Sequence, residues 1–203
     1  MATALTPLTY PVGIRADTIS TEARALRVRQ KCLRMSFGDF VATDQSDNTT
    51  QFTVDGKTLS LSQRHAIRNA TGLPIFDIHR VCLGTTWLVN LPGEKTNPMV
   101  RLEPQYVDGW RDWKATWKDN LDVYVRTTDG RGEEVKLRVR GQDVWKKRTH
   151  VYLGAQLVVD VRSVNVMSAY VPFLKDNEWD VTIAPGFDAS VVGTLTCVLL
   201  CPD

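Results

Sequence analysis

The C-terminal stretch of this chain carries no charged side chain between Asp188 and Pro202. A helix from Ala189 to Cys201 would have thirteen residues and a length of about 20 Å. A bilayer core is roughly 30 Å thick and needs about 20 apolar residues, so this helix is too short to span one. A helix that is apolar on every side must be buried on every side. The rest of the chain must therefore form a closed or nearly closed shell around it.

The two sides of this predicted helix differ in size. Large apolar residues cluster on one side, and small residues take most of the other, from Ala189 through Gly193 to Cys197. The slim side allows the enclosing wall to approach closely. Pro185-Gly186 marks a turn before the helix, and Asp188 stands where its carboxylate favours the positive end of the helix dipole. We therefore predict a central hydrophobic helix over residues 188–201.

The remaining sequence supplies short alternating runs separated by turn signals such as Asp129-Gly130. Many short strands at about 8–12-residue spacing are typical of an antiparallel sandwich or barrel. The runs are Asp39–Thr43, Gln51–Val54, Thr58–Ser62, His65–Ile67, Pro74–Arg80, Thr86–Leu91, Met99–Leu102, Leu121–Thr127, Glu134–Arg140, His150–Leu153, Gln156–Val161 and Glu178–Ile183. We predict a mainly β (α+β) fold, an antiparallel barrel of about twelve strands that encloses the C-terminal helix.

The domain organisation follows from the same pattern. No linker-like stretch separates the strands from the helix that they must enclose. We therefore expect an N-terminal extension over residues 1–24 and a single barrel domain over residues 25–203.

Three local patterns resemble the LURP-one-related family, a branch of the tubby-like superfamily. They are FVATDQSDNTTQFTVDGK followed by SLSQ, then HAIRNATGLPIFDIHR, and finally WDVTIAPGFDASVVGTLTCVLL. Together they run from about Val28 to Leu200. The resemblance implies a twelve-stranded barrel threaded by the final helix, and a distant relation to phospholipid scramblases and to the phosphoinositide-binding tubby proteins.

Composition argues against several classes of function and partner. Twenty-five basic and twenty-three acidic side chains leave a formal net charge of +2, whereas nucleic-acid binders usually show a basic excess. The start of the chain lacks the basic and apolar regions of a secretion signal. The four cysteines, Cys32, Cys82, Cys197 and Cys201, form no metal set. We expect an intracellular, cytoplasmic protein, peripheral at a membrane if it binds lipid, with no cofactor, no metal, no transmembrane segment and no nucleic-acid partner.

The sequence offers no catalytic constellation. His65, His79 and His150 lie in no nucleophile elbow or zinc motif. We interpret His79 and His150 as surface or strand-end residues. No glycine-rich run precedes a helix, which argues against a phosphate loop or a dinucleotide fold. We therefore expect a non-enzymatic protein.

Basic residues alternate along two predicted strands. They form two outward faces, which consist of Arg27, Arg29 and Lys31 and of Lys136, Arg138 and Arg140, and Lys146-Lys147-Arg148 follows in a predicted loop. Guanidinium groups can clamp phosphates bidentately, and anionic lipid attracts each basic residue near its surface by about 1 kcal/mol. The first hypothesis is thus a binding module for anionic headgroups, such as phosphoinositides. The alternative is that these residues are ordinary solvated faces.

A second hypothesis is a protein–protein adaptor or regulatory scaffold. Residues 92–98 and 103–119 are predicted loops rich in Pro, Gly and Trp, and loops often carry binding sites. Trp110, Trp113 and Trp117 have the spacing of one helical stripe, which we interpret as packing against the domain rather than as a stacking platform. A scramblase-like insertion of the final helix is a third hypothesis, and the helix length counts against it.

Overall fold

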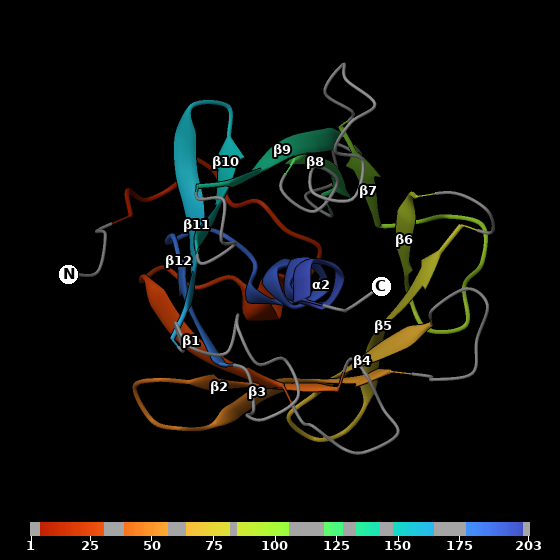
Figure 1. Cartoon of the computed structure of the whole chain (residues 1–203), viewed down its shortest axis with the longest axis horizontal. Coiled ribbons are helices and arrows are strands. Elements are labelled where there is room, and N and C mark those ends of the chain that lie inside the picture. Colours follow the sequence, from red (N-terminus) through yellow and green to blue (C-terminus); the bar gives the residue numbers. More distant parts are fainter. Residues whose placement is uncertain are drawn as a thin grey trace.

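The computed structural model describes residues 5–30, 39–56, 64–81, 85–105, 120–127, 133–142, 148–164 and 178–200. Within these residues the chain forms twelve strands. They are β1 Arg24–Gln30, β2 Phe40–Asp44, β3 Thr50–Gly56, β4 His65–Asn69, β5 Pro74–Arg80, β6 Trp87–Asn90, β7 Val100–Pro104, β8 Asn120–Arg126, β9 Glu134–Gly141, β10 Arg148–Leu153, β11 Gln156–Ser163 and β12 Glu178–Ile183. Each strand pairs antiparallel with its neighbours in sequence, and β1 pairs with β12 to close the barrel (Figure 1). The predicted fold class is confirmed.

The strands and turns follow the sequence signals closely. Eleven of the predicted runs coincide with strands β2 to β12, and the run Thr58–Ser62 lies outside the described residues. The twelfth strand is β1, which contains Arg27 and Arg29. Turn chemistry is visible between β4 and β5, where the Asn69 side chain accepts hydrogen bonds from the backbone N–H groups of Thr71 and Leu73 at 3.1 and 2.9 Å.

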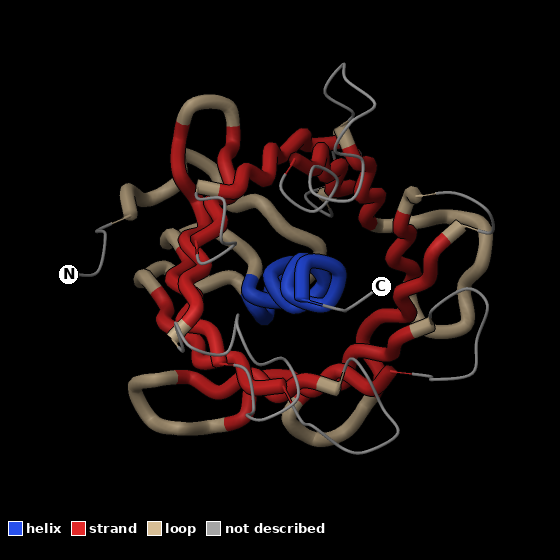
Figure 2. The backbone as a smooth tube through the Cα atoms, viewed as in Figure 1, coloured by secondary structure: helices blue, strands red, loops and turns tan. Residues whose placement is uncertain are grey.

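The helix α2, Ala189–Leu200, lies in the middle of the ring of strands (Figure 2). Residues 189–198 are all buried. The hydroxyls of Thr194 and Thr196 donate to backbone oxygens one turn earlier, so these polar groups are satisfied inside the core. A Cβ at Gly193 would lie 3.0 Å from the Phe52 ring, which shows how closely the wall approaches the slim side. The enclosed helix is confirmed; it begins at Ala189, and Cys201 lies outside the described residues.

The N-terminal residues close one end of the barrel around the start of α2. The Asp188 carboxylate accepts hydrogen bonds from the backbone N–H groups of Ile14, Arg15 and Ser190, at 2.8, 2.9 and 2.7 Å, and from the Thr18 hydroxyl. It therefore acts as the N-cap of the helix and as the anchor of the preceding chain. A Cβ at Gly13 would lie 2.2 Å from the Asp188 Cβ, so only glycine fits there.

This closure involves residues that we assigned to an extension from the sequence. Val12 is fully buried and Ile14 is nearly so, and a short 3₁₀ helix, η1 Ala16–Thr18, follows them. The boundary at residue 24 stays a prediction. Among the described residues, no helix has the length and apolar character needed to cross a bilayer.

Candidate functional site

The predicted basic residues lie on two separate faces of the barrel. Arg27 and Arg29 lie on β1, and Lys136, Arg138 and Arg140 lie on β9. Their strand neighbours Leu26, Val28, Leu137 and Val139 are fully buried, so the predicted alternation of inward and outward side chains is correct. Three strands, β10, β11 and β12, separate β1 from β9 around the barrel. Lys31 lies outside the described residues.

The face on β1 is electrically balanced by its neighbour β12. Arg27 Nε lies 2.8 Å from Asp180 Oδ1, and Arg29 Nε lies 2.8 Å from Glu178 Oε1. The strand register places these residues directly opposite each other. In the part of this face that the structure describes, two cations thus face two carboxylates, and an approaching anion meets little net charge there. We call Arg27, Arg29, Glu178 and Asp180 the β1–β12 face.

The face on β9 is not balanced in this way. Lys136 Nζ lies 2.6 Å from Asp122 Oδ2, on β8, and Arg140 Nη2 lies 3.8 Å from the other oxygen of the same carboxylate. Arg138 donates to the backbone oxygen of Gly154 at 2.8 Å. The hydrogen bond with Asp122 raises the pKa of Lys136, which keeps it charged. Lys136 and Arg140 therefore share one carboxylate, while Arg138 contacts a backbone oxygen.

The structure extends this basic face onto β10 and β11 through Arg148, which we predicted to lie in a loop, and Arg162, which we did not consider. The guanidinium of Arg148 contacts the Asp160 carboxylate at 3.0 and 3.1 Å, and that of Arg162 contacts it at 2.6 and 2.9 Å. Asp160 is 1% exposed. Burial opposes its ionisation, but the hydrogen bonds from both arginines outweigh burial and lower its pKa. The carboxylate therefore stays charged at neutral pH.

Arg148 corrects one prediction directly. We placed it in a loop with Lys146 and Lys147, yet it is the first residue of β10 and lies opposite Arg162 on β11. Lys146 and Lys147 lie outside the described residues. The signal in the sequence was Asp160-Val161-Arg162, because residues two apart on a strand share a face.

His150 corrects a second prediction. It is 9% exposed and lies inside β10, opposite Arg140 on β9 and Asp160 on β11, rather than at a surface or a strand end. His79 lies on an outward position of β5 and is partly buried, in agreement with its predicted orientation. His65 is buried beside Trp87, with ring centroids 6.0 Å apart.

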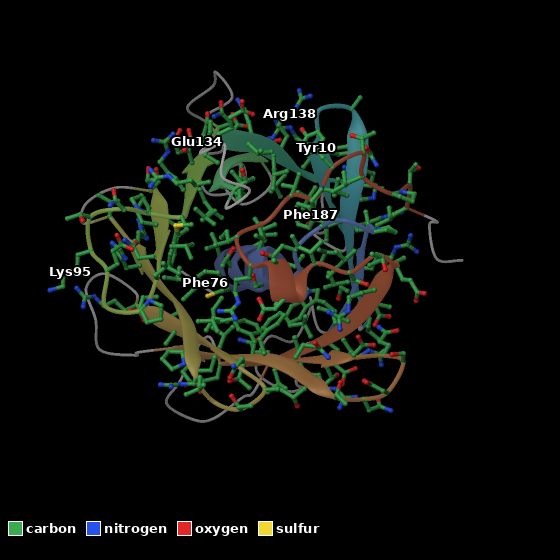
Figure 3. The ribbon with its side chains drawn as sticks, turned by 180° about the vertical axis from the view of Figure 1, so that it is seen from behind. Tyr10, Phe76, Lys95, Glu134, Arg138 and Phe187 are labelled. Atoms are coloured by element: carbon green, nitrogen blue, oxygen red, sulfur yellow. The ribbon has the colours of Figure 1, made fainter. Side chains whose placement is uncertain are left out.

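The outward faces of β9, β10 and β11, together with the adjoining face of β8, thus form one continuous basic surface. We call it the β9–β11 surface. Figure 3 shows Arg138 of this surface on the outside of the barrel, while Phe76 and Phe187 lie inside. Among the described residues it has six cations and three carboxylates, which are Arg126, Lys136, Arg138, Arg140, Arg148, Arg162, Asp122, Glu134 and Asp160. This excess of positive charge makes it the better candidate for an anion site.

Other candidate sites offer fewer groups that could bind a ligand. Among the described residues, no three His, Cys, Asp or Glu side chains come together as a metal site. A cavity of about 50 Å³ lies beside the start of α2, lined partly by Arg15, Arg24 and Ser190. Asp17 and Asp44 pair with its two arginines, so the cavity presents little net charge.

The predicted loop sites are only partly described. Residues 92–98 connect β6 and β7, and Gly93 N–H lies 3.3 Å from an Asp77 carboxylate oxygen. Of residues 103–119, the structure describes residues 103–105; Trp110, Trp113 and Trp117 lie outside the described part.

Comparisons with known proteins agree with this architecture. The X-ray structure of a protein from Arabidopsis thaliana is similar to this chain, with a TM-score of 0.63 and 17% sequence identity, over 93% of this chain and 96% of that one. At this identity the likeness establishes the fold alone. Comparison with curated proteins gave no significant match. The family model described as LURP-one-related matches residues 24–200, nearly the whole chain. The chain therefore belongs to the LURP-one-related family.

Proposed function

We propose that this protein is a non-enzymatic binding module that holds an anionic, phosphate-bearing headgroup against the β9–β11 surface. The observation that carries the proposal is the excess of six cations over three carboxylates among the described outward residues of β8 to β11. A phosphoinositide in the cytoplasmic leaflet is the ligand that we favour, because it combines phosphate groups with a negatively charged surface. On this proposal the protein is intracellular and peripheral at the membrane.

The strength of such an interaction follows from the number of uncompensated charges. Each basic residue near an anionic bilayer contributes about 1 kcal/mol. Three uncompensated cations would together contribute about 3 kcal/mol, or on the order of 100-fold in affinity. The arginines can also bind phosphate bidentately. Hydrogen bonds to Asp160 and Gly154 already hold Arg148, Arg162 and Arg138 in place, which reduces the entropy lost on binding.

Vesicle sedimentation with the full chain tests this proposal. The vesicles contain neutral lipid alone, neutral lipid with phosphatidylserine, or neutral lipid with a phosphoinositide, at low salt. We expect binding to phosphoinositide vesicles and a loss on the order of 100-fold in the triple variant Lys136→Ala, Arg138→Ala, Arg140→Ala. The matched control is Arg27→Ala with Arg29→Ala on the balanced β1–β12 face, for which we expect less than threefold change.

The source of the phosphate is tested in the same assay. A soluble inositol phosphate is added as a competitor to the vesicles that contain phosphoinositide. Full competition at low concentration would identify a soluble phosphate as sufficient, whereas weak competition would show that the bilayer surface contributes. No binding to any anionic vesicle, or equal binding by the triple variant, would contradict the proposal.

A protein–protein adaptor remains the second candidate, and exposed apolar side chains favour it. Leu73, in the β4–β5 turn, is 63% exposed, and Leu91, at the end of β6, is 38% exposed. Replacement of residues 92–98 by a Gly-Ser linker should then abolish capture of a specific protein partner, while vesicle binding is unchanged. Capture of the same proteins by an unrelated barrel would contradict the adaptor.

A further inference from the structure

Three polar side chains lie in contact in a row across the β9–β11 surface. The Tyr152 hydroxyl lies 2.9 Å from His150 Nδ1, and His150 Nε2 lies 3.3 Å from Asp160 Oδ1. The first contact is a hydrogen bond; the second is an electrostatic contact that is out of line for a hydrogen bond. Tyr152 and His150 are two residues apart on β10 and both face outward. This row of side chains therefore connects the half-buried phenol of Tyr152 to the buried carboxylate of Asp160 through the His150 imidazole.

Charged groups surround His150 from every strand that packs against it. Arg140 faces it from β9, Asp160 and Arg162 from β11, and Arg148 from β10 itself. Burial of the ring is the largest influence and lowers the pKa of His150; Arg148 and Arg162 lower it further, and Asp160 opposes them. The ring is therefore neutral at neutral pH in the protein without ligand.

The neutral ring determines what the Tyr152 hydroxyl can do. The negative charge of Asp160 beside Nε2 favours the tautomer that carries the ring proton on Nε2. In that tautomer Nδ1 is an acceptor, and the Tyr152 O–H donates to it. When His150 is protonated, Nδ1 becomes a donor to the Tyr152 oxygen. The Tyr152 O–H must then turn away from the ring, and it becomes available to an acceptor outside the barrel. Arg138, directly opposite Tyr152 on β9, faces the same space.

An anion on this surface would change the balance of charge around His150. It neutralises the repulsion that Arg148, Arg162 and Arg140 exert on a charged imidazole, and it gains the Tyr152 donor when the ring is protonated. Binding of the anion and protonation of His150 then favour each other, as linkage requires.

We propose that Tyr152, His150 and Asp160 form a proton-linked donor within the anion site, so that a phosphorylated ligand binds more tightly as the pH falls and His150 takes up a proton. This inference rests on the proposed function and names the donor and its regulation. Since one proton is taken up, affinity rises by at most tenfold per pH unit. The rise occurs between the pKa values of His150 without and with ligand.

The experiment uses the full chain and a polysulfated inositol as the probe. A sulfate ester keeps its charge between pH 5 and 8, whereas a phosphate monoester has a second pKa near 6 and would confuse the result. Binding is measured by calorimetry at pH 5.5, 6.5 and 7.5. We expect affinity to rise several-fold per unit as the pH falls in the wild type, and His150→Gln to remove this dependence. The matched control is His79→Gln, on β5 far from the surface, which should keep it.

A second variant tests the donor itself without altering the imidazole. Tyr152→Phe should bind like the wild type at pH 7.5, because the hydroxyl then donates to His150. At pH 5.5 it should bind about threefold to tenfold more weakly, because the outward donor is missing. Equal weakening at both pH values would show that Tyr152 is not switched by His150.

The imidazole also gives a direct signal. An NMR titration of the His150 ring should show a higher pKa with the probe bound than without it. An unchanged pKa, or a pH dependence that survives His150→Gln, would overturn the proton linkage while leaving anion binding intact. No probe binding together with no vesicle binding would instead overturn the proposed function.

Discussion

The β1–β12 face and the β9–β11 surface look alike in the sequence and differ in the folded protein. Each contains a strand on which basic residues alternate with apolar ones. On the first, Arg27 and Arg29 meet Asp180 and Glu178, so cations and carboxylates are equal in number among the described residues of this face. On the second, six described cations meet three carboxylates. The difference lies in the neighbouring strands, and it shows that a basic alternation alone does not define an anion site.

The two regions also differ in how deeply their carboxylates are buried. The Asp160 side chain is 1% exposed, whereas that of Asp180 is 40% exposed. A buried carboxylate between two arginines organises them into a fixed pair, while an exposed one competes with water. We therefore expect the β9–β11 surface to be rigid and charged, and the β1–β12 face to be a solvated ion-pair ladder.

The largest expected effect is on stability, from Asp160→Asn. The change removes the charge that holds Arg148 and Arg162, and we expect a loss of about 2–3 kcal/mol in the free energy of unfolding at pH 7. Because the folded-state pKa of Asp160 is lowered, its contribution is present above the pKa of an unfolded Asp and is lost as the pH falls through the folded value. Urea denaturation at pH 7 measures the loss of stability, and the same measurement in acid shows whether the difference between wild type and variant disappears as the pH falls.

The matched control for that change is Asp180→Asn on the β1–β12 face. Its carboxylate is 40% exposed, so we expect a loss below about 1 kcal/mol. Equal losses in the two variants would remove the distinction between a buried anchor and a solvated ladder.

The sequence was sufficient for features that depend on local periodicity. Alternation with period two placed Arg27 and Arg138 outward, and the uncharged stretch after Asp188 required an enclosing shell. The sequence was insufficient for pairings that close over long separations. Arg27 and Asp180 are 153 residues apart, and nothing local indicates that they meet.

Physical reasons also explain why the sequence analysis did not identify the roles of His150, Asp160 and Gly13. A register shift between Val151 and Tyr152 alters how β10 meets β11, and no pattern in the sequence marked that shift. Asp160 is charged yet buried, so a rule that keeps charges outside gives no hint of its role. The contact of Gly13 with Asp188 depends on the N-terminal chain reaching the far C-terminal helix.

A second prediction attempts to convert the balanced face into an anion site. The double variant Glu178→Gln, Asp180→Asn leaves Arg27 and Arg29 without carboxylate partners on β12. We expect it to strengthen binding to anionic vesicles by about 1–2 kcal/mol at low salt, because two negative charges are removed from the surface. Sedimentation at low and high salt measures the gain, which screening should reduce. An unchanged affinity would show that net charge is not what separates the two regions.

A third, smaller effect concerns stability against pH. The pKa of His150 is lowered in the folded protein, chiefly by burial, so the unfolded chain binds more protons just below pH 6.5. Stability should therefore fall as the pH decreases from about 6.5 towards the folded pKa, by at most about 1.4 kcal/mol per unit for one histidine.

The measurement is urea denaturation of wild type and His150→Gln at several pH values. The variant should show a shallower fall over that window. His79, whose pKa is also lowered, mainly by burial, keeps its own contribution and serves as the internal reference. If the free energy of unfolding of His150→Gln fell with the same slope as that of the wild type, His150 would not be responsible for the loss of stability at low pH.

The smallest effect separates the two regions most cleanly. Arg29 is 57% exposed and pairs with Glu178, and Arg138 is exposed and donates to the Gly154 carbonyl. Single alanine substitutions at either position should lower the free energy of unfolding by less than about 0.5 kcal/mol. Arg138→Ala should nevertheless weaken vesicle binding by about 1 kcal/mol, roughly fivefold, whereas Arg29→Ala should leave it unchanged. If the two variants were equally stable and lost equal vesicle affinity, both faces would belong to one diffuse electrostatic surface. A localised anion site predicts instead that only Arg138→Ala weakens binding.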